Sequence, residues 1–468
     1  MLDKLALLRG CMCIGVCCAF VLLVGMPAQG QSTDVKSTGA QSASQDAGSN
    51  QRYANMPEDA VPFGKFTKAY KEWYLTDDTL AYFGAARERN SVEMQDSDTV
   101  NIGFLGPIQN NPESPYGLAM LHGAQLAIEQ ANSRGGYRAN ESAQPKLYQL
   151  KVHPDSAQWG ASSTEAVKMV FDEHVVGILG SVDGASTHIM LRESLKLEFP
   201  IMDTATTDPT VTETRIPWLM HNFPDDRQQG YALAAAVFKQ RKLKRVAVIR
   251  AQTRYARVGV AKFFDEAKRL GHVPVLEVKF ERGDQDFSTQ LRMLKNAHVD
   301  AVVIWGEVPE AAKILKQMRV MGMNQPVFGP SRLCYPLIIE QAGAAAEGLV
   351  TTAALDPTRH DAKWLDFQTG YRAKFHEQPD PYAAYAYDGM NLLIAAIETA
   401  GLNRGKIMDA LRDHQGHPYD GVAGQAQFDH TLNNIAPITM ARVQGGKFVF
   451  SPPGTRPAAS VPREVGAH

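Results

Sequence analysis

Short polar segments follow six strand-like hydrophobic segments of the sequence. They combine glycines, hydroxyl side chains and single charges, and they lie at residues 106–117, 180–184, 203–209, 253–255, 306–307 and 329–332. Backbone N–H groups at helix N-termini bind carboxylates and other anions well, so loops of this kind suit a small polar ligand. The same residue types also serve as ordinary helix caps and turns. The prediction of a binding site therefore depends on six such segments recurring in the same setting.

Nothing in the sequence indicates catalysis. The chain has no G-x-S-x-G, H-E-x-x-H or P-loop motif, and no G-x-G-x-x-G that opens a helix. The candidate interior histidines, His122, His153, His188 and His221, are scattered along the chain. Cys334 has no obvious base nearby and is not expected to act as a nucleophile. We therefore expect a protein that is not an enzyme and that needs no cofactor or metal.

The composition is that of a globular protein with no surplus of charge. Of 468 residues, 44% are hydrophobic and 21% are charged, and 48 basic residues face 50 acidic ones. This balance gives no indication of nucleic-acid binding. The length suggests two or three domains of about 150 residues each. The only long apolar stretch is N-terminal, which argues against a protein with many membrane spans.

The N-terminal region reads as an export signal followed by two segments outside the main body. Lys4 and Arg9 precede the apolar stretch Cys11–Met26, and small residues near Gly30 form a cleavage site, so residues 1–30 are predicted to be a signal peptide. A retained membrane anchor is the alternative. Residues 31–56 are predicted to be a disordered linker. The aromatic-rich extension at 57–97 should pack on the main body or dock a partner, and 451–468 form a tail.

Strand-like and helix-like patterns alternate from Thr99 onward. The first set of predicted strands lies at 100–104, 148–152, 175–179 and 200–202, and the second at 246–249, 273–280, 301–305, 327–328 and 348–353. Amphipathic segments between them predict helices, including 258–270, 287–297, 311–321, 361–376 and 382–400. A hairpin is expected to turn at Gly445-Gly446. Strands separated by helices indicate parallel, doubly wound α/β sheets, and their number indicates two lobes.

Several segments in this order resemble the type I periplasmic binding proteins, in the Leu/Ile/Val-binding branch that serves ABC importers. The resemblance runs from Asn101 to Phe450, about three quarters of the chain. The segments that carry it are 129–136, 207–212, 226–230 just before a helix, 286–288, 345–350 and 383–389. It implies two Rossmann-like lobes joined by three crossings that close on a small molecule. The first lobe would span 98–225 and 355–434, and the second 226–354 and 435–450.

The same resemblance implies where a ligand would bind. In the first lobe the positions that hold an amino acid's carboxylate fall at Gly184, Ala205 and Thr207, with Asp183 beside them. In the second lobe the contacts fall at Tyr255, Glu307 and Ser331, and Tyr116 lies in the loop after the first strand. Together these eight positions are the expected ligand-binding site.

This chain departs from the leucine binders at three of these positions. Gly184 stands where they have a serine for the carboxylate, Ser331 where they have a glutamate for the ammonium group, and Glu307 where they have a tyrosine. Glu307 could replace the missing ammonium partner. Asp183 and Arg332 would equally suit a sugar, a polyol, an amide or an aromatic acid.

We therefore expect an exported, monomeric solute-binding protein of an ABC importer. Its ligand would be a branched-chain amino acid or a related small polar molecule, and its protein partners would be the permease subunits rather than nucleic acid. A sensory or regulatory ligand-binding module of the same fold is the alternative, and an exported hydrolase is a third reading that the motif search does not favour.

Overall fold

The first of the two large sheets is entirely parallel. The computed structural model describes residues 97–155 and 159–451, and the predicted signal peptide, linker, nearly all of the extension and the tail lie outside these residues. The first sheet has the strand order β2-β1-β3-β4-β5. Its strands are β1 (Thr99–Gly106), β2 (Leu147–Pro154), β3 (Ile178–Leu179), β4 (Ile201–Asp203) and β5 (Leu219–His221).

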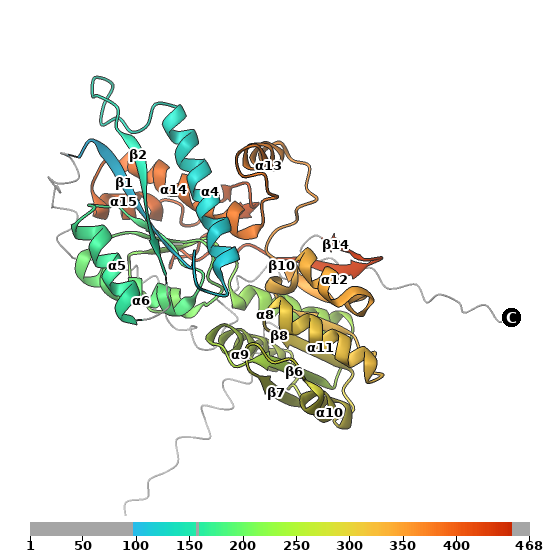
Figure 1. Ribbon diagram of the computed structural model, residues 1–468. Coiled ribbons are helices and arrows are strands. Elements are labelled where there is room, and N and C mark those ends of the chain that lie inside the picture. Colours follow the sequence, from blue (N-terminus) through green and yellow to red (C-terminus); the bar gives the residue numbers. More distant parts are fainter. Residues whose placement is uncertain (1–96, 156–158, 452–468) are drawn as a thin grey trace, which may run out of the picture. The chain divides into compact units, whose positions relative to one another are not determined.

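Helices from two distant parts of the chain make up the first lobe together with this sheet. The early ones are α4 (Ser114–Ser133), α5 (Trp159–Phe171), α6 (Gly184–Leu197) and α7 (Thr210–Glu213), and the late ones are α13 (Ala362–Phe375), α14 (Pro381–Ala400) and α15 (Arg404–Arg412). Helix α14, orange in Figure 1, lies against the cyan α4, and their apolar side chains share one core with β1 and β4. The first lobe is therefore built from two separate stretches of sequence.

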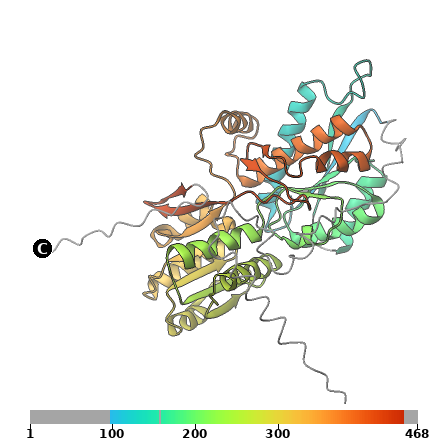
Figure 2. The same cartoon turned by 180° about the vertical axis from the view of Figure 1, so that it is seen from behind.

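The second sheet is parallel except at one edge. Its strand order is β14-β13-β10-β9-β8-β6-β7, and only the pairs of β13 with β10 and with β14 are antiparallel. The strands are β6 (Val246–Ala251), β7 (Leu276–Phe280), β8 (Ala301–Trp305), β9 (Val327–Gly329), β10 (Val350–Ala353), β13 (Thr439–Gln444) and β14 (Lys447–Ser451). Figure 2 shows the red β13–β14 hairpin joined to the orange-yellow part of this lobe. A separate short pair consists of β11 (Tyr419–Asp420) and β12 (Gln425–Ala426).

The helices of the second lobe cover this sheet and share a second core. They are α8 (Asp226–Ala234), which continues as a π-helix over Ala235–Gln240, then α9 (Arg254–Arg269), α10 (Ser288–Asn296), α11 (Val308–Val320) and α12 (Pro336–Ala342), with short 3₁₀ turns at Ser331–Leu333 and Gly343–Ala346. The chain crosses between the sheets three times, after β5, after β10 and before β13. Two crossings touch, because His221 at the end of β5 forms a bridge with Asn433.

The fold class predicted from the sequence is confirmed: two α/β lobes with parallel-dominated sheets. Strand β8 has the predicted bounds, and the hairpin turns at Gly445-Gly446, both of which have positive φ. Strands β3 and β7 begin later than predicted, and the three-residue strand β5 was not predicted because its apolar run is too short to show a period. The segment 226–230 was expected before a helix, but it forms the first turns of α8 because Asp225 caps the helix one residue earlier. Within residues 97–155 and 159–451, no helix is both long and apolar enough to cross a membrane.

Candidate functional site

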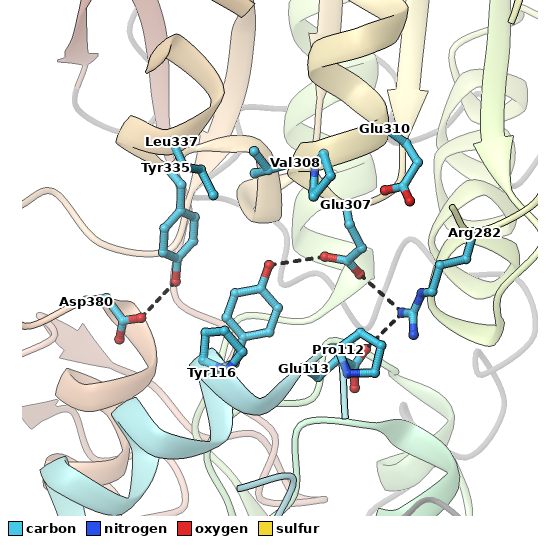
Figure 3. A pocket seen from close by; sticks show the side chains of 12 residues that line it. Pro112, Glu113, Tyr116, Arg282, Glu307, Val308, Glu310, Tyr335, Leu337 and Asp380 are labelled. Carbon is cyan, nitrogen blue, oxygen red and sulfur yellow. Dashed lines mark hydrogen bonds and ion pairs between the residues drawn. The ribbon is translucent and has the colours of Figure 1, made fainter. Parts of the chain in front are cut away.

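A pocket of about 260 Å³ lies where loops of the two lobes meet (Figure 3). The first lobe contributes Glu113 and Tyr116 at the start of α4 and Asp380, which caps α14. The second lobe contributes the start of α11 and the segment around Tyr335. The remaining lining residues are Pro112, Pro115, Arg282, Glu307, Val308, Pro309, Glu310 and Leu337. Side chains from both lobes therefore line the same pocket.

Hydrogen bonds cross this space from lobe to lobe. The Tyr116 hydroxyl donates to Glu307 Oε2 at 3.1 Å, and the Tyr335 hydroxyl donates to Asp380 Oδ2 at 3.1 Å (Figure 3). Arg282, at the rim, lies 3.5 Å from Glu113 and 3.9 Å from Glu307. These contacts hold the lobes together around the pocket.

Arg332 is the centre of the polar cluster behind the pocket wall. It lies in the 3₁₀ turn after β9 and is only 2% exposed. Its Nη1 donates to Glu113 Oε1 at 3.1 Å and to Glu307 Oε1 at 2.6 Å. The guanidinium also stacks over the Tyr255 ring, 3.9 Å from its centroid, and lies 5.4 Å from that of Tyr116. A cation of this chain is therefore held between carboxylates of both lobes and two aromatic faces.

The predicted second-lobe residues gather around this arginine. Tyr255, in the first turn of α9, is buried, and its hydroxyl has no hydrogen-bond partner within the part of the chain that the structure describes. Glu307 precedes α11 in the capping position, but its side chain does not cap the helix. Ser331, next to Arg332, donates its backbone N–H to Gln229 Oε1 at 2.8 Å. Tyr116, Tyr255 and Glu307 thus meet, while Ser331 is tied to α8.

Two predicted first-lobe positions lie at the start of α6. Asp183 caps this helix, and its carboxylate accepts a hydrogen bond from the Ala185 N–H at 3.1 Å. A Cβ atom at Gly184 would lie 2.4 Å from Asp208 Oδ2, and that carboxylate pairs with Arg254 of the second lobe at 2.7 Å. The ion pair between the lobes therefore leaves no room for a serine at position 184.

The groups expected to hold a carboxylate in the first lobe already bond to aspartates of this chain. The Ala205 N–H donates to Asp203 Oδ1 at 3.2 Å. The Thr207 hydroxyl, which is buried, donates to Asp226 Oδ2 at 3.1 Å. These residues lie on the loop after β4 and do not line the pocket.

Sequence reasoning did not place Glu113 in the site, and it named Arg332 only as a group that would suit ligands other than an amino acid. Glu113 had one visible signal, a carboxylate between two prolines after the first strand, at residues 112–115. The signal for Arg332 was its place in the polar segment 329–332, which follows a predicted strand. Nothing in the spacing joins the two, because they are 219 residues apart.

The stability that Asp183 contributes should depend on pH. Burial, together with the negative charge of Glu113, raises the pKa of the Asp183 carboxyl to about 6, whereas an aspartate in the unfolded chain has a pKa of about 3.9. Between these values the folded chain holds a proton that the unfolded chain has lost, so stability falls as the pH rises. Asparagine caps helices as well as aspartate and stays neutral. We expect the free energy of unfolding of the native protein, relative to Asp183→Asn, to fall between pH 4 and 7. Urea unfolding of both proteins across this range checks it, and parallel curves would contradict it.

Comparisons with known proteins agree with this architecture. The sequence profile of the periplasmic binding protein family matches residues 99–447. A Leu/Ile/Val-binding protein homolog of Brucella abortus is 27% identical over 337 residues, which are 70% of this chain and 86% of that protein.

Two solved structures have the same fold over three quarters of the chain. The branched-chain amino acid transporter substrate binding protein LivJ from Streptococcus pneumoniae, in complex with isoleucine, is 26% identical with a TM-score of 0.66, covering 75% of this chain and 100% of that one. The leucine binding protein LivK from Thermotoga maritima is 25% identical with a TM-score of 0.66, covering 75% and 98%. The expectation of a solute-binding protein rather than an enzyme is thereby confirmed. The chain belongs to the periplasmic binding protein family, in its Leu/Ile/Val-binding branch.

Proposed function

We propose that this protein captures an amino acid or a related small polar molecule between its lobes and delivers it to an ABC importer. The observation that supports this most is the pocket lined by side chains of both lobes, since a solute bound there contacts both and favours their closure. Its volume of about 260 Å³ suits a solute smaller than a typical drug. The relatives named for leucine or branched-chain amino acids agree with a solute of this size.

The protein would act as an exported monomer that docks on permease subunits. Residues 1–30 would direct export and be removed near Gln31, and the near-neutral charge suits a solute-binding role better than nucleic-acid binding. N-terminal sequencing of the protein recovered outside the cytoplasm should find Gln31. Full-length protein in the membrane fraction, with Met1 intact, would contradict this.

Thermal unfolding of the full chain with a library of amino acids, organic acids, amides and sugars tests the proposed function. A solute that binds the native state and is present at a concentration of 100 times its Kd adds about 2.7 kcal/mol to the free energy of unfolding and raises Tm. The protein should first be unfolded and refolded to release any solute that it carries from the cell. If no member of the library shifts Tm, the proposal fails.

Thr207→Val should weaken solute binding about ten- to a hundredfold, because we expect the solute to replace Asp226 as the partner of the Thr207 hydroxyl when the lobes separate. Valine keeps the shape of threonine but removes a buried hydroxyl, and an unsatisfied polar partner costs about 1–3 kcal/mol. Calorimetry with the solute found above measures the effect. The matched control is Thr369→Val, on the exposed face of α13, where the hydroxyl donates to the Leu365 carbonyl in the same helix. Equal affinities of the two variants would remove Thr207 from the binding site.

A further inference from the structure

Every acidic side chain that lines the pocket already has a partner in this chain. Glu113 and Glu307 accept hydrogen bonds from Arg332, and Glu307 accepts a second from Tyr116. Glu310 accepts the N–H of Gly283 at 2.8 Å, and Asp380 accepts the Tyr335 hydroxyl as well as the Ala383 N–H that it caps. An ammonium group entering the pocket would have to compete with each of these contacts.

The aromatic faces that could bind a cation are also taken. Arg332 lies 3.9 Å from the Tyr255 centroid and 5.4 Å from the Tyr116 centroid. Tyr116 is further stacked on Tyr382, with ring centroids 4.7 Å apart. The guanidinium therefore fills the place where carboxylates and aromatic rings together would attract a ligand cation.

The groups that remain unsatisfied here can donate hydrogen bonds. Arg332 Nε and the Tyr255 hydroxyl are both buried, and neither has a hydrogen-bond partner in residues 97–155 and 159–451. They belong to one stacked pair, in which the guanidinium carbon lies 3.9 Å from the centroid of the Tyr255 ring. An ammonium group offers only donors, whereas a carboxylate offers only acceptors and forms strong bonds with a guanidinium. The cluster lacks an acceptor, not a cation.

We propose that Arg332 determines specificity, so that the site takes small carboxylates that carry no ammonium group and discriminates against free amino acids. The solute's carboxylate would accept hydrogen bonds from Arg332 Nε and the Tyr255 hydroxyl. Glu113, Tyr116 and Glu307 line the pocket and also contact Arg332. A solute in the pocket therefore reaches the Nε side of Arg332 when the lobes separate. This inference rests on the proposed function and narrows its ligand class.

Matched ligands test the inference. Leucine, its 2-oxo acid and leucinamide share one side chain but carry both charges, only the carboxylate or only the ammonium group. Further pairs of aliphatic and aromatic monocarboxylates with their 2-amino counterparts allow for different pocket shapes. Calorimetry on the refolded full chain should find at least one carboxylate bound tenfold or more tightly than its amino counterpart, and no binding of leucinamide.

Variants at Arg332 should remove this preference. Arg332→Met should weaken the best carboxylate about a hundredfold and leave its amino counterpart nearly unchanged. If that variant fails to fold, Arg332→Lys keeps the charge paired with the glutamates but lacks Nε, and about tenfold weaker binding is expected. Arg250→Met is the matched control, because Arg250 is also buried in the second lobe, pairs with Glu277 at 2.7 Å and does not line the pocket. It should leave the affinities unchanged.

The outcomes separate this inference from the proposed function. If amino acids bind as tightly as their unaminated counterparts, or if the wider library yields only neutral solutes, the inference is wrong and the solute-binding function stands. If no solute of the library binds, both are wrong. An Arg332→Met or Arg332→Lys protein that keeps the carboxylate preference would also overturn the assignment to Arg332.

Discussion

Asp225→Ala should lower the free energy of unfolding by about 3–5 kcal/mol, the usual cost of removing one member of a buried ion pair. Asp225 is fully buried at the first crossing and caps α8, where it forms a capping box with Gln228. Its carboxylate accepts Arg227 Nε at 2.7 Å and Asn433 Nδ2 at 3.1 Å, so it ties α8 to the third crossing. Alanine removes all of these bonds and leaves the charge of buried Arg227 without this carboxylate.

Two further variants separate the ion pair from the helix cap. Asp361→Ala removes the cap of α13, where the carboxylate accepts the Trp364 N–H but is 49% exposed, so a loss of only about 1 kcal/mol is expected. Asp225→Asn keeps a capping side chain and removes the charge, and it should fall between the two. Urea unfolding measures all three. Similar losses for Asp225→Ala and Asp361→Ala would mean that the buried pair adds nothing beyond an ordinary cap.

Gly123→Ala should destabilise the first lobe by about 3 kcal/mol, although alanine is the better helix former. An added Cβ at position 123 in α4 would lie 2.1 Å from the Ala383 carbonyl oxygen in α14. Because backbone atoms cannot rotate away, the two helices must move apart, and overpacking of this kind costs about 1–3 kcal/mol or more. The close approach of α4 to α14 therefore requires glycine.

Gly370→Ala is the matched control for this substitution. Gly370 also lies within a helix, α13, but the atom nearest to an added Cβ would be Gln130 Nε2 at 3.8 Å. With that space available, alanine should stabilise the protein by about 0.5–1 kcal/mol. Equilibrium unfolding of the two variants should thus give changes of opposite sign. A stabilised Gly123→Ala protein would show that the helices are not packed as closely as described.

Much of the fold follows from local patterns that the sequence contains. Buried parallel strands appear as short apolar runs, and β8 lies between Asp300 and Gly306, where the apolar run stops on both sides, so its limits could be predicted. The Gly445-Gly446 turn could be predicted because two positive φ angles favour glycine. The starts of β3 and β7 could not be predicted, since the apolar residues before these strands continue the pattern without joining the sheet.

The sequence by itself determined the two-lobe α/β architecture and the absence of catalytic motifs, because periodicity and motif spacing are local properties. Only the tertiary structure decided what the site contains. It placed Arg332 against Glu113, 219 residues away, and it set the Asp208–Arg254 ion pair where a side chain at Gly184 would lie. The ion pairs of the site form between loops of two different lobes. A local sequence pattern contains no information on which of these loops meet.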